Sequence, residues 1–249
     1  MKNFVTAIAC ITLLASCSSD NATTTPAPTP ASTAKVASQV TFENDYGTFA
    51  LEYNPDHTLK SAVSDSQSLS LTYLLSYANG RISNVSGDNN GQDFDVDFTY
   101  AANGTINGVT VTGVQKYVTY DAANQYYEIK ENAEALARVR YIVNDEGDLM
   151  EVMSFNNQGN FIDGKTYYYE ANQKGPLYNA NRVTVQLAMA CRSQALLSCS
   201  FGGYRPFKNF AGAHSAPIDL TNTFDTAGYV LDSDKQEDVD YATFTYIEL

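Results

Sequence analysis

The sequence predicts a mainly all-β protein, a curved antiparallel β-meander of repeated hairpins with one short helix or loop insertion around residues 180–215. Three observations support this prediction. The 249-residue chain contains 18 Tyr and 12 Phe but no Trp, and Tyr and Phe suit half-buried pleated surfaces. Alternating apolar and polar runs recur along the chain, separated by turn residues. The spacing between the end of one run and the start of the next is nearly constant.

The repeated unit is clearest at residues 98–106, Phe-Thr-Tyr-Ala-Ala-Asn-Gly-Thr-Ile. An aromatic residue ends a run, a glycine follows four residues later, and an apolar residue restarts the chain two residues after the glycine. A hairpin loop often needs one residue with positive φ, which glycine adopts without steric cost. Six such units are present, and in all but the first a glycine follows the strand end; the strands end at Tyr53, Tyr77, Tyr100, Val143, Phe155 and Phe224.

The alternating runs are the predicted strands. They cover residues 40–43, 48–53, 71–77, 94–100, 109–111, 117–120, 126–129, 141–143, 165–169 and 241–246.

Residues 172–217 interrupt this pattern. Lys174-Gly175-Pro176 predicts a turn, and the apolar stretch 183–199 is compatible with either a strand or a helix, because its apolar residues satisfy both periods. Length and composition favour a helix over at least residues 188–197, which would pack on the open face of the curved sheet. Residues 202–217 are predicted to form a long loop.

The first 38 residues have no strand pattern. Residues 1–16 predict a lipoprotein signal peptide, because a short apolar stretch ends in Leu14-Ala15-Ser16 before Cys17, the residue that would be lipidated. Residues 17–38 are rich in Thr, Pro and Ala and predict a flexible tether. Residues 39–249 are then a single β-rich domain.

The formal net charge of −13 opposes binding to phosphate backbones, so no nucleic-acid partner is expected. The predicted partners are the membrane, through the N-terminal lipid, and a glycan or an envelope protein.

Two cysteines, Cys191 and Cys199, would remain in an oxidising compartment after export. A disulfide between them requires a bend, because eight residues of straight helix separate them by about 12 Å along the axis. A continuous helix and a disulfide are therefore alternatives.

No combination of residues indicates catalysis, a metal site or a cofactor. His57 lies in a predicted turn and His214 in a predicted loop, without partners that would form a zinc site or a catalytic triad. Asp93, Asp95 and Asp97 share one strand face, where a solvated surface is favoured over a calcium site. The Tyr126-Tyr127 and 167–169 tyrosines favour packing over a sugar platform.

Residues 14–17, Leu-Ala-Ser-Cys, resemble the lipobox of bacterial lipoproteins. With this lipobox, the tether, the hairpin units and the Lys174-Gly175-Pro176 turn, the chain resembles Bacteroides-type outer-membrane lipoproteins that carry a porin-like β-domain of unknown function. Residues 77–82, Tyr-Ala-Asn-Gly-Arg-Ile, are similar to the tyrosine–glycine (YD) repeats of Rhs-type proteins. The resemblance implies a curved sheet rather than a true pore. It implies lipid anchoring in the outer membrane, on its periplasmic or cell-surface face, and no activity.

We therefore expect a non-catalytic envelope lipoprotein, not an enzyme, that acts as a binding or structural module. The alternative is a glycan-acting hydrolase, which needs a cleft with two carboxyl groups about 5–10 Å apart. A membrane-embedded barrel is disfavoured because Asp93, Asp95 and Asp97 would place charge where lipid excludes it.

Overall fold

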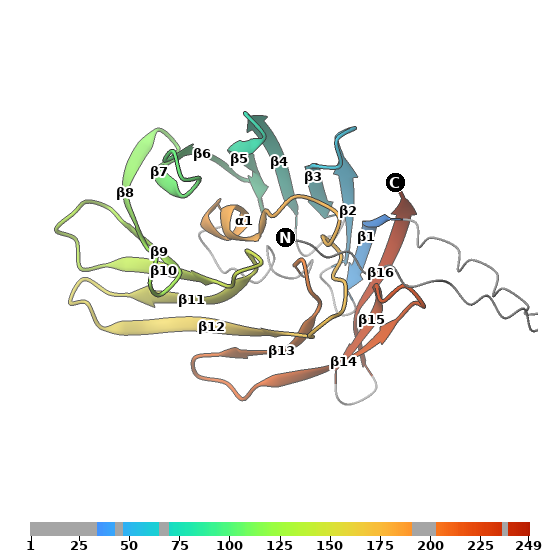
Figure 1. Ribbon diagram of the computed structural model, residues 1–249. Helices are drawn as coiled ribbons and strands as arrows, with labels where there is room; N and C mark the ends of the chain where they lie inside the picture. The colour runs from blue at the N-terminus through green and yellow to red at the C-terminus, as the bar shows by residue number, and fades with distance from the viewer. Residues whose placement is uncertain (1–33, 43–46, 65–69, 191–202, 236–238) are drawn as a thin grey trace, which may run out of the picture. The chain divides into compact units, whose positions relative to one another are not determined.

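The computed structural model describes residues 34–42, 47–64, 70–190, 203–235 and 239–249 (Figure 1). These residues form sixteen strands and one short helix. The elements are β1 (Lys35–Phe42), β2 (Gly47–Tyr53), β3 (Leu59–Ser64), β4 (Leu71–Ala78), β5 (Arg81–Asn89), β6 (Gln92–Tyr100), β7 (Ile106–Val111), β8 (Val114–Asp121), β9 (Tyr126–Lys130), β10 (Arg138–Val143), β11 (Leu149–Phe155), β12 (Phe161–Tyr169), α1 (Thr184–Ala190), β13 (Phe207–Gly212), β14 (Ile218–Phe224), β15 (Val230–Lys235) and β16 (Val239–Glu248).

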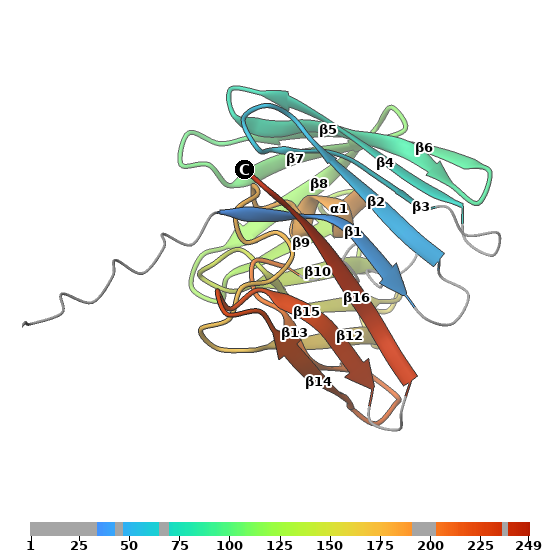
Figure 2. The same cartoon turned by 90° about the vertical axis from the view of Figure 1, so that its right-hand side faces the viewer.

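The sheet is an antiparallel meander, as the sequence predicts. Each strand pairs with its neighbours in the chain, and β1 pairs with β16, which closes the sheet into a barrel (Figure 2). The closing register runs from Lys35 opposite Glu248 to Phe42 opposite Ala242. Closure differs from the curved sheet with an open face that we expected. It leaves no unpaired strand edge among the described strands.

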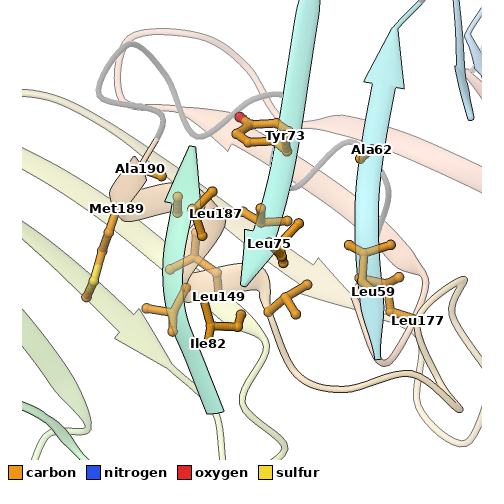
Figure 3. Packing of buried hydrophobic residues seen from close by; sticks show 14 of the residues in the cluster. Leu59, Ala62, Tyr73, Leu75, Ile82, Leu149, Leu177, Leu187, Met189 and Ala190 are labelled. Carbon is orange, nitrogen blue, oxygen red and sulfur yellow. The ribbon is translucent and has the colours of Figure 1, made fainter. Parts of the chain in front are cut away.

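Apolar side chains alternate toward the inside of the barrel. Leu75 on β4 lies opposite Val85 on β5, which lies opposite Val96 on β6, and all three are buried. The helix α1 contacts β5 and β6 and lies inside the ring of strands (Figure 1). Its Leu187 side chain lies among the apolar side chains of the core (Figure 3). The barrel therefore has an apolar interior.

Many outward positions carry polar and charged side chains, alongside exposed apolar ones such as Leu74 on β4. Glu52 on β2, Lys60 on β3 and Asp95 and Asp97 on β6 are all exposed. In a transmembrane barrel the outward face is the apolar one, and charge at its middle is destabilising. The exposed charges on β2, β3 and β6 do not fit that arrangement.

Five of the six predicted units form turns with the same backbone hydrogen bonds. In each, the first loop residue donates to the carbonyl four residues later and accepts from the N–H three residues later, over 2.8–3.0 Å. The fourth loop residue has positive φ, and His57, with φ of 65°, replaces the glycine in the first unit. The five turns cover residues 54–58, 101–105, 144–148, 156–160 and 225–229. The sixth unit is a tight turn in which Asn79 and Gly80 both have positive φ.

Tyrosines at strand ends link neighbouring hairpins. The hydroxyl of Tyr77 donates to the carbonyl of Leu59 over 2.6 Å, and that of Tyr100 donates to the carbonyl of Ile82 over 2.7 Å. Leu59 and Ile82 are the residues that restart the chain in the preceding units. The same bond joins Tyr169 to Leu149 over 2.6 Å. Burial of these rings also raises the pKa of Tyr77 to about 12. The abundance of tyrosine therefore has a structural cause in this repeat.

Two expectations for the insertion around 180–215 need adjustment. The helix begins at Thr184, earlier than predicted, and residues 191–197 lie outside the described residues. The long loop predicted for 202–217 is wrong for β13, which pairs with β12. The strand was missed because a bulge between Tyr168 and Tyr169 disturbs the pairing, so Phe207 and Phe210 do not show strict alternation. In addition, β1 starts at Lys35, within the range assigned to the tether.

Candidate binding site

The barrel has two different ends. We call the end that carries Lys35, where β1 begins, the near end; it also carries the turns at 54–58, 79–80, 101–105, 144–148 and 225–229. The far end carries the turns at 90–91, 112–113 and 156–160 and the connection 131–137.

A segment of the β12–β13 connection, residues 172–190, enters the inside of the barrel at the near end and finishes with α1; we call it the inner segment. Its Asn181 side chain accepts from the N–H of Leu59 over 2.8 Å and donates to the Tyr77 hydroxyl over 2.9 Å. Thr184 donates to the carbonyl of Gly147 over 3.0 Å. The inner segment therefore binds the same turns and tyrosines that form the repeat.

Further bonds join the inner segment to the start of β1. Asn179 donates to the carbonyl of Lys35 over 2.7 Å and to the Tyr229 hydroxyl over 2.6 Å. The carbonyl of Pro176 accepts from the N–H of Ala37 over 3.2 Å. Lys35 itself forms an ion pair with Asp225 over 2.9 Å. These contacts close the near end around the point where the chain enters the barrel.

The buried carboxylate of Asp148 binds the last residues of the β12–β13 connection, just before β13 begins. Asp148, only 2% exposed, accepts from the backbone N–H groups of Tyr204 over 2.7 Å and Arg205 over 3.1 Å. Burial raises the pKa of Asp148 to about 6. A Cβ at Gly203 would lie 2.0 Å from Asp148 Oδ1, so the close approach requires glycine there. Arg205 also forms an ion pair with Glu146, whose pKa is lowered by that hydrogen bond.

The far end contains a cavity of about 320 Å³. Its apolar wall comes from inward-facing strand residues and from the end of α1, namely Val109, Val111, Ile129, Val139, Tyr141 and Met189. Its rim includes Lys116, Lys130, Glu131 and Arg138, which we call the mouth. The side chain of Glu131 is 63% exposed, so the cavity is reached from solvent at the mouth.

On the outward face of β9 and β10, three cations share the carboxylate of Glu128. Glu128 lies 3.1 Å from Lys130, 3.1 Å from Arg138 and 2.7 Å from Arg140. Burial would raise the pKa of Glu128, but the hydrogen bonds from Arg140 and Lys130 hold it below its usual range.

Two further contacts complete this charge distribution. Lys116, whose side chain is 6% exposed, pairs with Glu131 over 2.5 Å. The guanidinium of Arg138 stacks on the Phe155 ring with a separation of 4.0 Å. Lys116 lies opposite buried Val109, on the inward face of β8, whereas the cluster around Glu128 lies on the outward face of β9 and β10.

The cysteines of the sequence predictions, Cys17, Cys191 and Cys199, lie outside the described residues, so lipidation and the disulfide stay predictions. His57 occupies the predicted turn, and His214 lies in the β13–β14 connection with Nε2 3.2 Å from the carbonyl oxygen of Ile162. Neither histidine lines the cavity.

The three aspartates of β6 lie on its exposed outer face, as expected. Asn84 on the neighbouring strand donates to Asp95 over 2.6 Å and to Asp97 over 2.9 Å. Over the described ranges, no group of three or more His, Cys, Asp or Glu residues is placed to hold a metal ion.

The tyrosine runs contribute to both faces of the sheet. Tyr127 and Tyr167 are buried inside, whereas Tyr168 is 47% exposed. The ring of Tyr167 stacks on Phe207 at 5.4 Å. Packing therefore accounts for the inward rings.

The carboxylate pair with the most unequal environments is Glu146 and Asp148, but it has no space for a substrate. The crevice beside Asp148, which Leu177 and Tyr204 also line, has a volume of about 0 Å³. A sugar ring does not fit there.

Within the part of the chain that the structure describes, none of the helical residues form a segment with the length and apolar character that crossing a bilayer requires.

Comparisons with known proteins gave structural neighbours only. No family model matches the chain, and no curated protein matches it. A porin-like protein from Bacteroides vulgatus is 12% identical, with a TM-score of 0.44 over 86% of this chain and 100% of that chain. A porin-like protein from Bacteroides uniformis is 13% identical, with a TM-score of 0.43 over 85% of this chain and 96% of that chain. The function proposed below rests on the residues of this chain alone.

Proposed function

We propose that the protein is a non-catalytic envelope lipoprotein whose barrel binds a ligand in the cavity at its far end. The observation that carries this proposal is an apolar interior that the inner segment occupies at the near end and that leaves a cavity of about 320 Å³ at the other. Apolar pockets of this size with a few polar groups are typical ligand sites.

The outward polarity of the barrel supports a water-exposed position. Lipid would exclude Asp95 and Asp97 on the outer face of β6, so the barrel itself is not the membrane attachment. A lipid on Cys17 and a tether would supply that attachment in the outer membrane, on its periplasmic or cell-surface face. Lys35 begins β1 on the near end, and the mouth lies at the far end.

The non-catalytic assignment is supported by how the carboxylates are used. Asp148 binds two backbone N–H groups and Glu128 binds cations, so both serve structural contacts. The hydrolase alternative would need a solvent-filled cleft beside a carboxyl pair, and the Glu146–Asp148 pair lacks one. A glycan or an envelope protein as a partner stays a prediction.

The proposal is tested with the barrel alone, residues 34–249. The described buried core and the sixteen described strands lie in that range, which is one compact unit. The neutral fluorescent probe N-phenyl-1-naphthylamine should bind with one saturable site per chain. Val111→Trp should abolish binding because Val111 lines the cavity.

Thr110→Trp is the matched control, because Thr110 lies opposite exposed Asp97 on the outer face and should leave binding unchanged. Ser154→Phe is a second filling variant, which keeps the test valid if Val111→Trp fails to fold. The proposal is rejected if the probe does not saturate, or if a folded filling variant binds it as the wild type does.

A further inference from the structure

We infer that the near end of the barrel holds a second binding site, for a hydroxylated carboxylic acid of the size of one acidic sugar unit. The site is a cavity of about 290 Å³ between the inner segment and the turns at 79–80 and 101–105. It shares no lining residue with the far-end cavity, so it is separate from the site of the proposed function. Its polar lining comes from Arg81, Tyr100, Asn181, Arg182 and Gln186.

Tyr100 joins the strand side of this cavity to the inner segment. Its hydroxyl donates to the carbonyl of Ile82 over 2.7 Å and accepts from Nε2 of Gln186 over 3.4 Å. The guanidinium of Arg81 lies over the Tyr100 ring, 5.4 Å from its centroid. A Cβ at Gly104 would lie 3.1 Å from a terminal nitrogen of Arg81. The Arg81 side chain therefore extends across the end of the barrel between two turns, where it lines the cavity.

The second cation of the cavity, Arg182, belongs to the inner segment. Its guanidinium lies over the Tyr204 ring, 5.3 Å from the centroid, and donates to the backbone carbonyl of Asp145 over 3.5 Å. A guanidinium has five N–H donors, and a ring beneath its face occupies none of them. Arg182 is also exposed to solvent, so donors remain for a bound molecule.

The residues that line this cavity include two cations and no carboxylate. Neither Arg81 nor Arg182 forms an ion pair with any residue that the structure describes. Glu146, whose charge lies near Arg182, is occupied by Arg205. The planar fork of a guanidinium matches a carboxylate in two parallel hydrogen bonds, which are among the strong ones. Two unpaired forks beside one cavity therefore select an anionic ligand.

The size and polarity of the cavity select the rest of the ligand. Its volume of about 290 Å³ lies near the lower end of the range typical of small-molecule sites, which is larger than an inorganic anion needs. Oε1 of Gln186 is buried and has no hydrogen-bond partner. The terminal torsion of Gln is soft, so a small rotation lets this oxygen accept from a ligand hydroxyl. A carboxylate for the arginines and hydroxyls for the amide together describe an acidic sugar.

The test is a titration of the ¹⁵N-labelled barrel, residues 34–249, with D-glucuronate, followed by NMR. The backbone signals of Gly80 and Gly104, which line the cavity, should shift and saturate. Glucose has the hydroxyls without the carboxylate, so it should bind at least about tenfold more weakly. Acetate has the carboxylate without the ring and should bind at least about threefold more weakly.

Variants test the two arginines directly. The double variant Arg81→Gln/Arg182→Gln should weaken glucuronate binding at least about tenfold, because both charge-assisted contacts are lost. Lys60→Gln removes an exposed cation on β3 that does not line the cavity, and is the matched control. If circular dichroism shows that the double variant does not fold, each single variant should weaken binding at least about threefold.

The inference is overturned if glucuronate causes no saturable shifts, or if glucose or acetate binds as tightly as glucuronate. It is also overturned if a folded arginine variant binds glucuronate as the wild type does. The N-phenyl-1-naphthylamine assay reports on the other end of the barrel, so the proposed function and this inference can each fail alone.

Discussion

Replacing Asp148 by Asn should remove a specific part of the pH dependence of stability. Burial holds the pKa of Asp148 at about 6 in the folded protein, against about 3.9 in an unfolded chain. The folded state therefore binds this proton more tightly than the unfolded state does. The resulting stabilisation is fully present below about pH 4 and is lost as the pH rises through about 6. At 1.36 kcal/mol for each pH unit, the difference between the two pKa values corresponds to about 3 kcal/mol.

The assay is urea unfolding of the barrel, residues 34–249, followed by circular dichroism between pH 4 and pH 8. Other carboxylates, including Glu128 and Glu146, have lowered pKa values, so their protonation in acid destabilises the folded protein. The useful quantity is therefore the difference in stability between wild type and variant. The stability of the wild type minus that of Asp148→Asn should fall by about 2 kcal/mol from pH 4 to pH 8, because the unfolded carboxyl is already about half ionised at pH 4.

A constant offset from the lost hydrogen bond to Tyr204 or Arg205 does not affect this comparison. Asp219→Asn, at an exposed position on β14, controls for the loss of one surface charge. A difference that stays flat or rises with pH would show that Asp148 is not stabilised in its protonated form, and would refute the reasoning.

Three further predictions concern the repeat, the helix and the anchor. Gly80→Ala should cost about 1 kcal/mol in urea unfolding, because Gly80 has φ of 73° with no atom within 4 Å of an added Cβ; an unchanged midpoint would contradict a backbone origin. Leu187→Ala should destabilise the barrel by about 2–5 kcal/mol, since Leu187 is fully buried; a loss under about 1 kcal/mol would mean that α1 is not part of the core. Cys17→Ser in the full chain should abolish incorporation of an alkyne-labelled fatty acid during growth, and persistent labelling would exclude Cys17 as the lipid site.

Much of the strand order was predictable because the repeat is encoded locally. The turns at residues 101–105 and 144–148 depend on one residue with positive φ and on hydrogen bonds within five residues, so short sequence windows contain the information. The same rule located the turn at 54–58, although His57 takes the left-handed position there without being glycine. The fold class was therefore accessible from the sequence.

The candidate site was not predictable, because its parts come from distant places in the chain. Lys116, Lys130 and Arg138 belong to three strands, and Met189 belongs to a helix that enters from another connection. The sequence analysis had directed attention to Asp93, Asp95 and Asp97, which lie outside on β6. Residues 116–140 contain four cations and four acids, so charge along the chain gives no signal for the site.

The sequence alone determined that hairpins follow one another in order, because each turn is specified by residues adjacent in the chain. Closure depended on the tertiary structure, since Lys35 meets Glu248 only after the twist of all the intervening strands has accumulated. Closure also decides which face is the inside. It turns the alternating apolar residues into a single interior, encloses the inner segment, and leaves the cavity at the far end.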